Sequence, residues 1–378
     1  MRVLFAATPG ANYALSTVPL AWTLRLAGHE VLMATGGDGL KAKDAGLPVE
    51  DIMPGHNAVG MVLETFAKHP ELAGEYAGID HADFDAVQRV YAKLTNHQTV
   101  MTDGVVRAAE EWRPDVVINS PQYVGGLLAA AKVGVPVVEH GIGLIHYDGF
   151  SEKLREWNAP LFERYGVELP ERQYAIDIAP PSLAQNTRGW KMRCVPYNGG
   201  YVVPEDFRTA PERPRIAVTL GTMAPAFGGL SPLNKLIALA ADIDAEFLLA
   251  LGNVDTTELG TVPDNVEIRG WVPLSLLLRT SAGLVHHGGA GSTLAALAHG
   301  VPQILMPEEG ERYANAQLIA ARGAGIAQAA TELTKEAIDS LLHDASLRTA
   351  AAEVREEMRA MPHPATVEAH LREITGKD

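Results

Sequence analysis

Cysteine is nearly absent from this chain of 378 residues, in which Cys194 is the only one. A single thiol cannot form an intramolecular disulfide, and this fits the reducing cytoplasm, where we expect the protein to reside. No uncharged apolar run reaches the roughly 18 residues that indicate a membrane span, so no membrane association is expected. The apolar run Val3–Ala7 is broken by Thr8-Pro9-Gly10. It therefore predicts a buried strand followed by a turn rather than a signal peptide.

Basic runs are also missing. The chain has 31 Lys and Arg against 46 Asp and Glu, and its formal net charge is −15. This balance argues against a nucleic-acid partner, and it requires that any anionic ligand be held by local donors. Neither H-x-x-x-H nor C-x-x-C spacing occurs, so we expect no metal site. The triplet Asp242-Ile243-Asp244 joins a predicted helix to a predicted strand and is interpreted as a solvated turn.

Short apolar runs that alternate with longer helical patterns are what the sequence does contain. Such alternation is typical of a parallel sheet with helices on both faces. In the first half, the predicted strands are Val3–Ala7, Val31–Ala34, Val116–Ile118 and Val135–Val138, and the predicted helices lie around Ser16–Ala27, Asp83–Glu111 and Tyr123–Lys132. In the second half, the predicted strands are Ile216–Leu220, Phe247–Leu251, Val266–Ile268, Leu284–His287 and Gln303–Met306. The sequence thus predicts an α/β protein of two doubly wound, parallel-sheet domains with a cleft between them.

The boundary between the halves is marked by composition. The segment Val195–Arg215 contains four prolines and two glycines and has little periodicity, which is typical of a linker. We therefore assign residues 1–195 to a first domain, 196–214 to the linker and 215–363 to a second domain. A terminal helix at about 364–378 is expected to pack back on the first domain.

One glycine-rich segment, "GLVHHGGAGSTLAALAHGVPQILMP" from Gly283 to Pro307, carries most of the functional information. A predicted strand ends in paired histidines, and the glycines that follow let the backbone approach a ligand closely. A helix then begins near Ser292. Its unpaired N–H groups and partial positive charge favour an anion, to which His287 can donate a further hydrogen bond. The pattern predicts a diphosphate cradle built without lysine or arginine.

The block from about Gly270 to Gly325 resembles the nucleotide-sugar signature of the GT-B glycosyltransferases. Together with "RVLF" at the start, "RCVPYNGG" before the linker and "AVTLGTM" after it, it is similar to the enzymes that glycosylate macrolides, enediynes and aromatic polyketides. The resemblance implies two Rossmann-like domains, with the acceptor bound by the first and the donor by the second. It also implies that the nucleobase and the diphosphate are bound by Thr222, Trp271, Val272, His287, Gly289, Gly291, Ser292 and Thr293.

The chain departs from the family pattern in two places. Many relatives have Asp-Gln at the end of the donor block, whereas this chain has Glu311-Arg312; these two are assigned to donor binding, and the change favours a modified deoxysugar over glucose. Relatives commonly carry a histidine as general base in the first turn, where this chain has Tyr13. The orienting aspartate is also missing from "INSPQ", which offers Ser120 and Gln122.

Three accounts of the missing base stay open. The segment "VVEHGIGLIHYDG" supplies Glu139, His140, His146 and Asp148 after a strand, and we select Glu139, His140 and Asp148 as candidate bases. Alternatively, an acidic acceptor needs little help, or the sugar is attached to an aromatic carbon. The candidate acceptor pocket is drawn from the segments His56–Tyr76 and Ile142–Phe150 and from the first turn; its residues are Tyr13, Met61, Phe66 and Ile142.

The function that the sequence predicts is inverting, metal-independent glycosyl transfer. A deoxysugar moves from thymidine diphosphate (TDP) to a hydrophobic natural-product aglycone, with an O-link favoured. The nucleotide sugar is a co-substrate, no cofactor is expected, and a homodimer is possible. The alternatives are a C-glycosyltransferase on an aromatic polyketide, an epimerase of the same fold, an auxiliary activator of a partner transferase and, more weakly, a dinucleotide-dependent dehydrogenase, although G-x-G-x-x-G is missing after the first strand.

Overall fold

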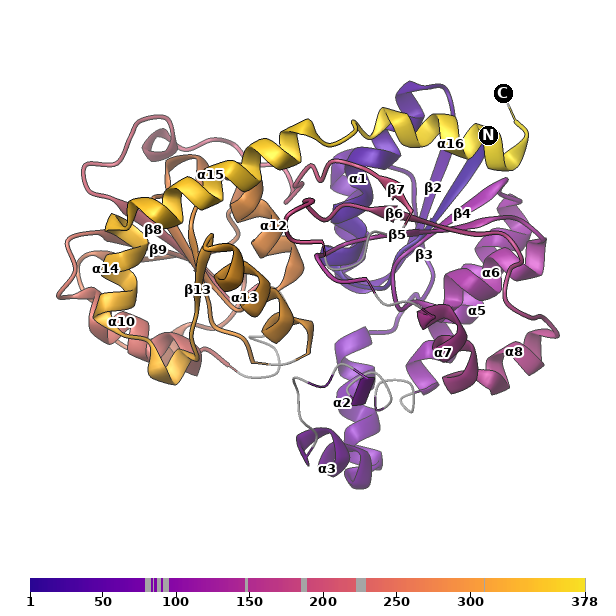
Figure 1. Cartoon of the computed structure of the whole chain (residues 1–378). Helices are drawn as coiled ribbons and strands as arrows, with labels where there is room; N and C mark the ends of the chain where they lie inside the picture. Colours follow the sequence, from indigo (N-terminus) through magenta and orange to yellow (C-terminus); the bar gives the residue numbers. More distant parts are fainter. Residues whose placement is uncertain are drawn as a thin grey trace.

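The computed structural model of the chain describes residues 1–78, 83, 85–86, 90, 95–146, 149–184, 189–221, 229–308 and 310–377. These residues form two lobes, and each lobe is built on one sheet whose strands all pair in parallel (Figure 1). Within the described residues, sheet A has the order β3-β2-β1-β4-β5-β6-β7, and sheet B has the order β10-β9-β8-β11-β12-β13. The prediction of two doubly wound α/β units is confirmed.

The strands agree with the predicted apolar runs to within about two residues. Sheet A consists of β1 (Arg2–Ala6), β2 (Glu30–Thr35), β3 (Val49–Asp51), β4 (Val116–Asn119), β5 (Val137–His140), β6 (Gln173–Asp177) and β7 (Trp190–Lys191). Sheet B consists of β8 (Arg215–Thr219), β9 (Glu246–Ala250), β10 (Val266–Arg269), β11 (Gly283–His286), β12 (Gln303–Leu305) and β13 (Gly325–Ala327). The sequence analysis missed β3, β6, β7 and β13. These strands are short or only partly buried, so they lack a continuous apolar run.

Helices cover both faces of each sheet. In the first lobe they are α1 (Ala11–Leu26), α2 (Ala58–Lys68), α3 (Pro70–Gly78), α5 (Thr95–Trp112), α6 (Val124–Val133), α7 (Phe150–Trp157) and α8 (Ala159–Tyr165). In the second they are α10 (Asn234–Ala240), α11 (Leu274–Leu277), α12 (Ala290–His299), α13 (Glu311–Arg322), α14 (Lys335–His343) and α15 (Ala345–Ala360), followed by α16 (Ala365–Thr375). The start of the predicted helix Asp83–Glu111 falls largely outside the described residues; from Thr95 onward it is helical.

Alternation along the central strands explains the two layers. On β1, Val3 and Phe5 pack in one core with Leu24 of α1, whereas Leu4 and Ala6 pack in another with helices α5 and α6. Successive side chains of a strand point to opposite faces, so a run that is apolar throughout needs cover on both sides. Sheet B repeats this arrangement, with separate cores on its two faces.

The linker and the last two helices connect the lobes. Between β7 and β8 the only regular element in the described residues is the short 3-10 turn η2 (Glu205–Phe207). The linker is fixed to the second lobe by Asn198, whose Oδ1 accepts a hydrogen bond from the Ser275 hydroxyl at 2.6 Å. Helix α15 runs along the second lobe, and α16 crosses to lie against the first, where it contacts α1 (Figure 1).

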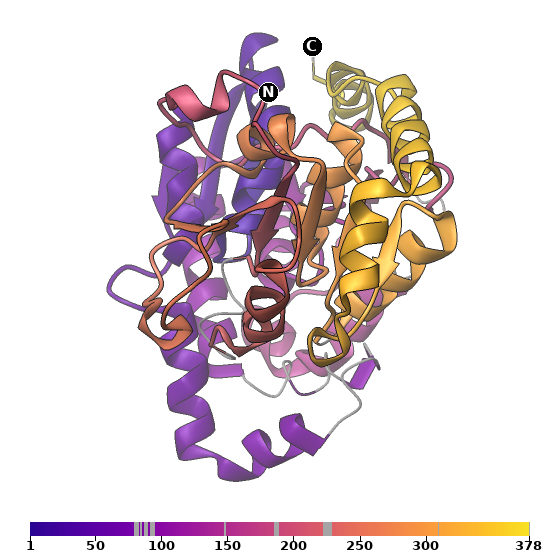
Figure 2. The same cartoon turned by 90° about the vertical axis from the view of Figure 1, so that its left-hand side faces the viewer.

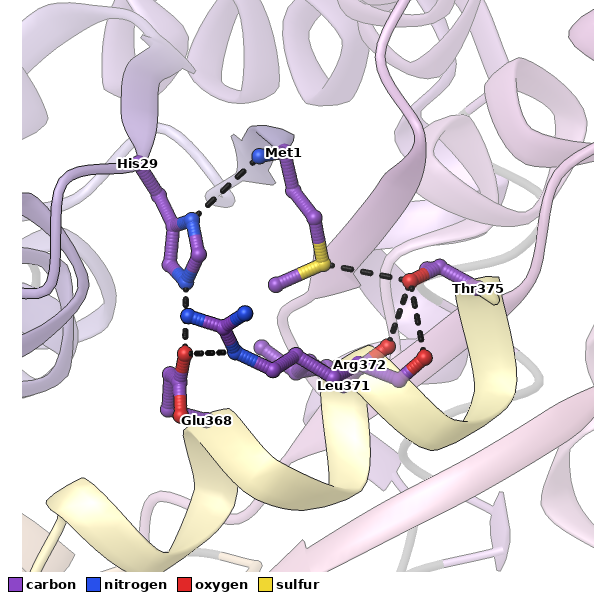
Figure 3. Close-up of polar contacts among 6 residues, drawn as sticks. All are labelled: Met1, His29, Glu368, Leu371, Arg372 and Thr375. Carbon is purple, nitrogen blue, oxygen red and sulfur yellow. Dashed lines mark hydrogen bonds and ion pairs between the residues drawn. The ribbon is translucent and has the colours of Figure 1, made fainter. Parts of the chain in front are cut away.

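The contacts of α16 join the two ends of the described chain (Figure 3). His29 Nε2 lies 2.9 Å from a carboxylate oxygen of Glu368, and its Nδ1 lies 3.3 Å from the amino group of Met1. Glu368 is also paired with Arg372. The Thr375 hydroxyl contacts the Met1 sulfur at 3.2 Å. The side chain of His29 is only 3% exposed, so this cluster holds α16 against the first lobe.

Each sheet changes winding direction at one place, between β1 and β4 in sheet A and between β8 and β11 in sheet B. In doubly wound sheets, ligands bind beyond the carboxyl ends of the strands at such a switch point. The two loop clusters at these points are therefore the candidate site. By contrast, helices α2 and α3 project away from the first sheet in both views (Figures 1 and 2).

Candidate active site

The helix that follows β11 at the switch point of sheet B has no side-chain cap at its N-terminus. Helix α12 begins at Ala290, its N-cap residue Gly289 is extended (φ −66°, ψ 145°), and no side chain caps it. The backbone N–H of Thr293 is bonded to Gly289 O at 3.0 Å, which leaves the first-turn amides of residues 290–292 for a ligand. Gly291 is exposed and has no atom within 4 Å of the position a Cβ would take. The geometry is that of an anion site.

The imidazole of His287 lies between two glycines of this loop cluster. A Cβ on Gly289 would fall 2.3 Å from its Nε2, and a Cβ on Gly221 would fall 2.6 Å from its Cε1. Burial of the ring, with the nearby charge of Arg312 and His286, lowers the pKa of His287 well below its usual value. The ring is therefore neutral near pH 7, and a neutral imidazole still donates one N–H.

His286 has a structural role instead. It is fully buried, its Nε2 lies 2.8 Å from Gln303 Oε1, and its Nδ1 accepts a hydrogen bond from the Gly288 amide. Burial lowers its pKa to about 4. Asn315 on α13, which the sequence analysis did not select, donates to Gly288 O at 3.0 Å. These contacts hold the backbone of the glycine loop at Gly288.

The hydroxyl groups predicted to bind phosphate are placed differently from each other. Thr293 is fully buried, and its hydroxyl donates to Gly289 O at 3.0 Å. It therefore supports the turn and presents no donor to a ligand in this structure. Ser292 is half-buried beside the free amides of the first turn. Thr222, predicted to contact the nucleotide, lies outside the described residues.

The predicted nucleobase platform stands where the lobes meet. Trp271 follows β10, is half-buried, and lies near Gly199 of the linker. Lys41, from the 3-10 segment η1 (Gly37–Ala45) of the first lobe, places its Nζ 5.0 Å from the centre of a Trp271 ring. The Val272 side chain is buried in the core of the second lobe, so only its backbone is available to a ligand.

The Glu311-Arg312 pair begins α13, next to the glycine loop. A Cβ on Gly288 would meet the Arg312 backbone oxygen at 3.1 Å, which shows how closely the two segments pack. Arg312 Nη1 lies 3.6 Å from Glu308. Burial raises the pKa of Glu311, and the charge of Arg312 lowers it in part.

A pocket occupies the switch point of sheet A and reaches the second lobe. It is formed by the segments after β1, β4 and β5 together with the start of α13. Its lining residues are Tyr13, Pro121, Gln122, Glu139, Ile142, Gly143, Ile145, His146, Phe150 and Glu311. The structure thus brings the predicted acceptor residues Tyr13 and Ile142 together with the candidate base Glu139 and with Glu311 of the donor block.

The place of the missing family aspartate is occupied by two residues with separate roles. Ser120 is buried and accepts a hydrogen bond from the Thr8 amide at 3.2 Å. Gln122 lines the pocket and has φ +63°, a left-handed conformation that is uncommon for a residue with a side chain. Neither residue supplies a carboxylate near Tyr13.

Several predicted residues do not reach this pocket. His140 is 1% exposed, neither ring nitrogen has a hydrogen-bond partner, and burial lowers its pKa to about 4. It points into the protein, so it cannot meet an acceptor in this structure. Met61 packs on the core of the first lobe, and Phe66 lies 5.8 Å from the ring of Tyr76 on the projecting α2–α3 pair. Asp148 lies outside the described residues.

Two further features of the described part of the chain bear on the site. It contains no cluster of three or more His, Cys, Asp or Glu side chains arranged to hold a metal ion. Asp244, in the predicted solvated turn, is 92% exposed. Separately, no helix among the described residues combines the length and apolarity needed to span a bilayer.

Comparison with known proteins agrees with this geometry. The chain matches the models of the erythromycin biosynthesis protein CIII-like N-terminal domain over residues 22–221 and C-terminal domain over residues 234–374. It is 40% identical to the elloramycin glycosyltransferase ElmGT of Streptomyces olivaceus, over 100% of this chain and 98% of that protein.

Two solved structures extend the comparison. The glycosyltransferase SnogD from Streptomyces nogalater superposes with a TM-score of 0.83 at 38% identity, covering 100% of this chain and 99% of that one. The spinosyn rhamnosyltransferase SpnG, complexed with thymidine diphosphate, gives 0.81 at 28% identity, covering 98% and 100%.

The fold and the site together define a glycosyltransferase of the GT-B type. The chain belongs to the erythromycin biosynthesis protein CIII-like family of these enzymes.

Proposed function

We propose that this enzyme transfers a deoxysugar from thymidine diphosphate to a hydrophobic aglycone in antibiotic biosynthesis. One observation carries the proposal: an anion cradle at one switch point directly faces a pocket at the other. A Cβ on Gly143 of the pocket would lie 3.0 Å from the Cβ of Ala290, the first residue of α12, and Glu311 lines the same pocket as Tyr13. A donor held by its diphosphate would thus present its sugar to an acceptor.

The nature of the donor is supported by the relatives. SpnG was solved with thymidine diphosphate and is a rhamnosyltransferase, and rhamnose is a 6-deoxyhexose. Glu311-Arg312, in place of the Asp-Gln that binds sugar hydroxyls in many relatives, fits a sugar with fewer hydroxyls. Among the candidate acceptor residues, Ile142 and the Tyr13 ring give the pocket its apolar surface.

The reaction would proceed with inversion at the anomeric carbon and without a metal ion. The acceptor attacks from the pocket side while the diphosphate leaves toward α12. The first-turn amides and His287 stabilise the negative charge that develops on the leaving group. Donors of this kind are worth roughly 3–4 kcal/mol each when removed.

The acceptor atom divides the proposal into two forms. An O-link is favoured, and Glu139 is the candidate carboxylate that lines the pocket. C-glycosylation of an aromatic polyketide is the second form, and one observation favours it: the first turn carries Tyr13 in place of the histidine that many relatives use as a base.

The test is nucleotide binding followed by transfer. Thymidine diphosphate with excess EDTA should raise the melting temperature, because a ligand at about 100 times its Kd stabilises a protein by about 2.7 kcal/mol. A shift that needs added Mg²⁺ would contradict the metal-free cradle. TDP-rhamnose and TDP-glucose should then be offered with phenolic and polyketide acceptors. Absence of both binding and transfer would overturn the proposal.

A further inference from the structure

The pocket at the switch point of sheet A contains a histidine that is held by a buried carboxylate. His146 lines the pocket beside Tyr13 and Glu139. Its Nε2 lies 2.9 Å from Oδ1 of Asp177, the last residue of β6. Asp177 is fully buried and also receives hydrogen bonds from the Ala179 amide at 2.9 Å and from the Lys191 ammonium.

These contacts fix the protonation pattern of the pair. Burial by itself would raise the pKa of Asp177, but the hydrogen bonds from His146, Lys191 and the Ala179 amide outweigh it and lower the pKa below its usual value. Asp177 is therefore a carboxylate, which can only accept hydrogen bonds. Nε2 of His146 must therefore donate in this pair, and in the neutral ring the lone pair that can accept a proton is on Nδ1.

The ring is also held sterically. A Cβ on Gly141 would fall 2.8 Å from Cε1 of His146 and 2.8 Å from the backbone oxygen of Ile176. The segment after β5 can therefore fold back only because residue 141 is glycine. The His146 side chain is 4% exposed, so only a small part of the imidazole meets the pocket.

We propose that His146 is the general base that activates the acceptor, and that Asp177 is the residue that positions it. This assignment rests on the proposed function. An aspartate that holds an imidazole in one tautomer and stabilises the imidazolium is the arrangement that hydrolytic triads use. In this chain, the arrangement replaces the histidine that relatives carry at the position of Tyr13.

The proton of the acceptor hydroxyl passes to Nδ1 of His146 while the acceptor oxygen forms a bond to the anomeric carbon. The bond from that carbon to the diphosphate oxygen breaks, and its electron pair leaves on the diphosphate. Lys191 offsets the charge of Asp177 before transfer, and the imidazolium that forms is stabilised by the same carboxylate.

The decisive variant is His146→Gln, with His343→Gln as the matched control, because His343 is exposed at the end of α14. TDP-rhamnose is the donor probe; 2-naphthol and its more acidic relative 1-nitro-2-naphthol are the acceptors. We expect kcat with 2-naphthol to fall by about 10²–10⁴-fold, since that is the usual cost of removing a general base. The loss should be smaller with 1-nitro-2-naphthol, and the Kd for thymidine diphosphate should not change.

The pH profile separates His146 from the other titrating groups at the pocket, which are Tyr13, Glu139 and Glu311, with Lys191 and Asp177 behind it. If His146 is the base, the acid limb of kcat/KM should vanish in His146→Gln and persist in Glu139→Gln. Asp177→Asn should lower kcat more than it raises KM. Its melting temperature is measured alongside, because Lys191 loses its partner.

The outcomes are distinct. Equal kcat in His146→Gln and wild type, within about threefold, would overturn the base assignment and leave the proposed function intact. Loss of activity in Glu139→Gln alone would assign the base to Glu139. A wild-type enzyme that neither binds thymidine diphosphate nor transfers rhamnose would overturn the proposed function, and the assignment with it.

Discussion

The two switch points share a topology but differ in the chemistry they present. At β8/β11 the ligand groups are backbone amides exposed by glycines, with one imidazole, His287, wedged between two of them. At β1/β4 the groups are side chains, among them Tyr13, Gln122, Glu139 and His146, from three separate segments. Backbone amides at a helix start suit an anion such as a diphosphate, whatever group that anion carries. A side-chain site can change with the acceptor while the sheet stays the same.

The largest effect should follow from adding one methyl group to the main-chain site. In Gly289→Ala the new Cβ would lie 2.3 Å from His287 Nε2, so the ring or the helix start must move. Because both the amides and the imidazole are displaced, we expect kcat/KM to fall by about 10³-fold or more. Gly291→Ala is the comparison: its Cβ meets open space, so any loss reports contact with the ligand. Measured Kd values for thymidine diphosphate that match between the two variants would contradict this account.

The paired histidines should separate by role. His287→Ala should lower kcat by about 10²–10³-fold with the fold preserved, since a preorganised donor to the leaving group is lost. His286→Ala should mainly lower the melting temperature, because Gln303 and the Gly288 amide lose their buried partner. Steady-state rates and melting curves on both variants decide this. Equal rate losses with unchanged melting would mean that the roles were assigned to the wrong histidines.

Acid should lower the free energy of unfolding through two buried histidines, His140 in the first lobe and His286 in the second. His140 and His286 both have a pKa of about 4 in the folded protein, against about 6.5 when unfolded. The unfolded state binds more protons between these values, so stability is complete above pH 6.5 and falls as the pH drops toward 4, by about 3 kcal/mol for each histidine.

His140→Leu should therefore reduce the loss of unfolding free energy between pH 7 and pH 4, measured with urea, at little cost at pH 7, since neither ring nitrogen of His140 has a partner. His286→Leu should flatten the same profile but cost stability at pH 7. An unaltered acid profile in His140→Leu would show that this ring titrates normally.

The smallest effect is expected at the first turn. Tyr13→Phe should keep activity within about tenfold of wild type, because the ring is expected to line the acceptor pocket rather than to take up the acceptor proton. Glu139→Gln should cost more, since it removes a carboxylate from the pocket. Initial rates across pH 6 to 9 provide the measurement. A loss of 10²-fold or more in Tyr13→Phe, with Glu139→Gln unaffected, would place the proton transfer on the tyrosine.

The sheets and the geometry of the glycine-rich anion site follow from local patterns in the sequence. Apolar runs such as Val3–Ala7 and Leu284–His287 predict buried strands because both faces of such a strand need cover. The cradle could be predicted because it is contiguous: strand, glycines and helix start lie within ten residues, and backbone donors need no distant partner. The side-chain contacts within this segment were not predicted; for example, the Thr293 hydroxyl donates to Gly289 O.

The side-chain pocket depends on contacts between segments that are far apart in the sequence. Whether a polar residue after a strand faces a pocket or the core depends on the loop that follows, so Glu139 reached the pocket and its neighbour His140 did not. Asp177 and His146 are 31 residues apart, and nothing local in either segment indicates the other. Their contact exists because β5 and β6 pair side by side and their carboxyl ends meet at one edge of the sheet, which no pattern along the chain records.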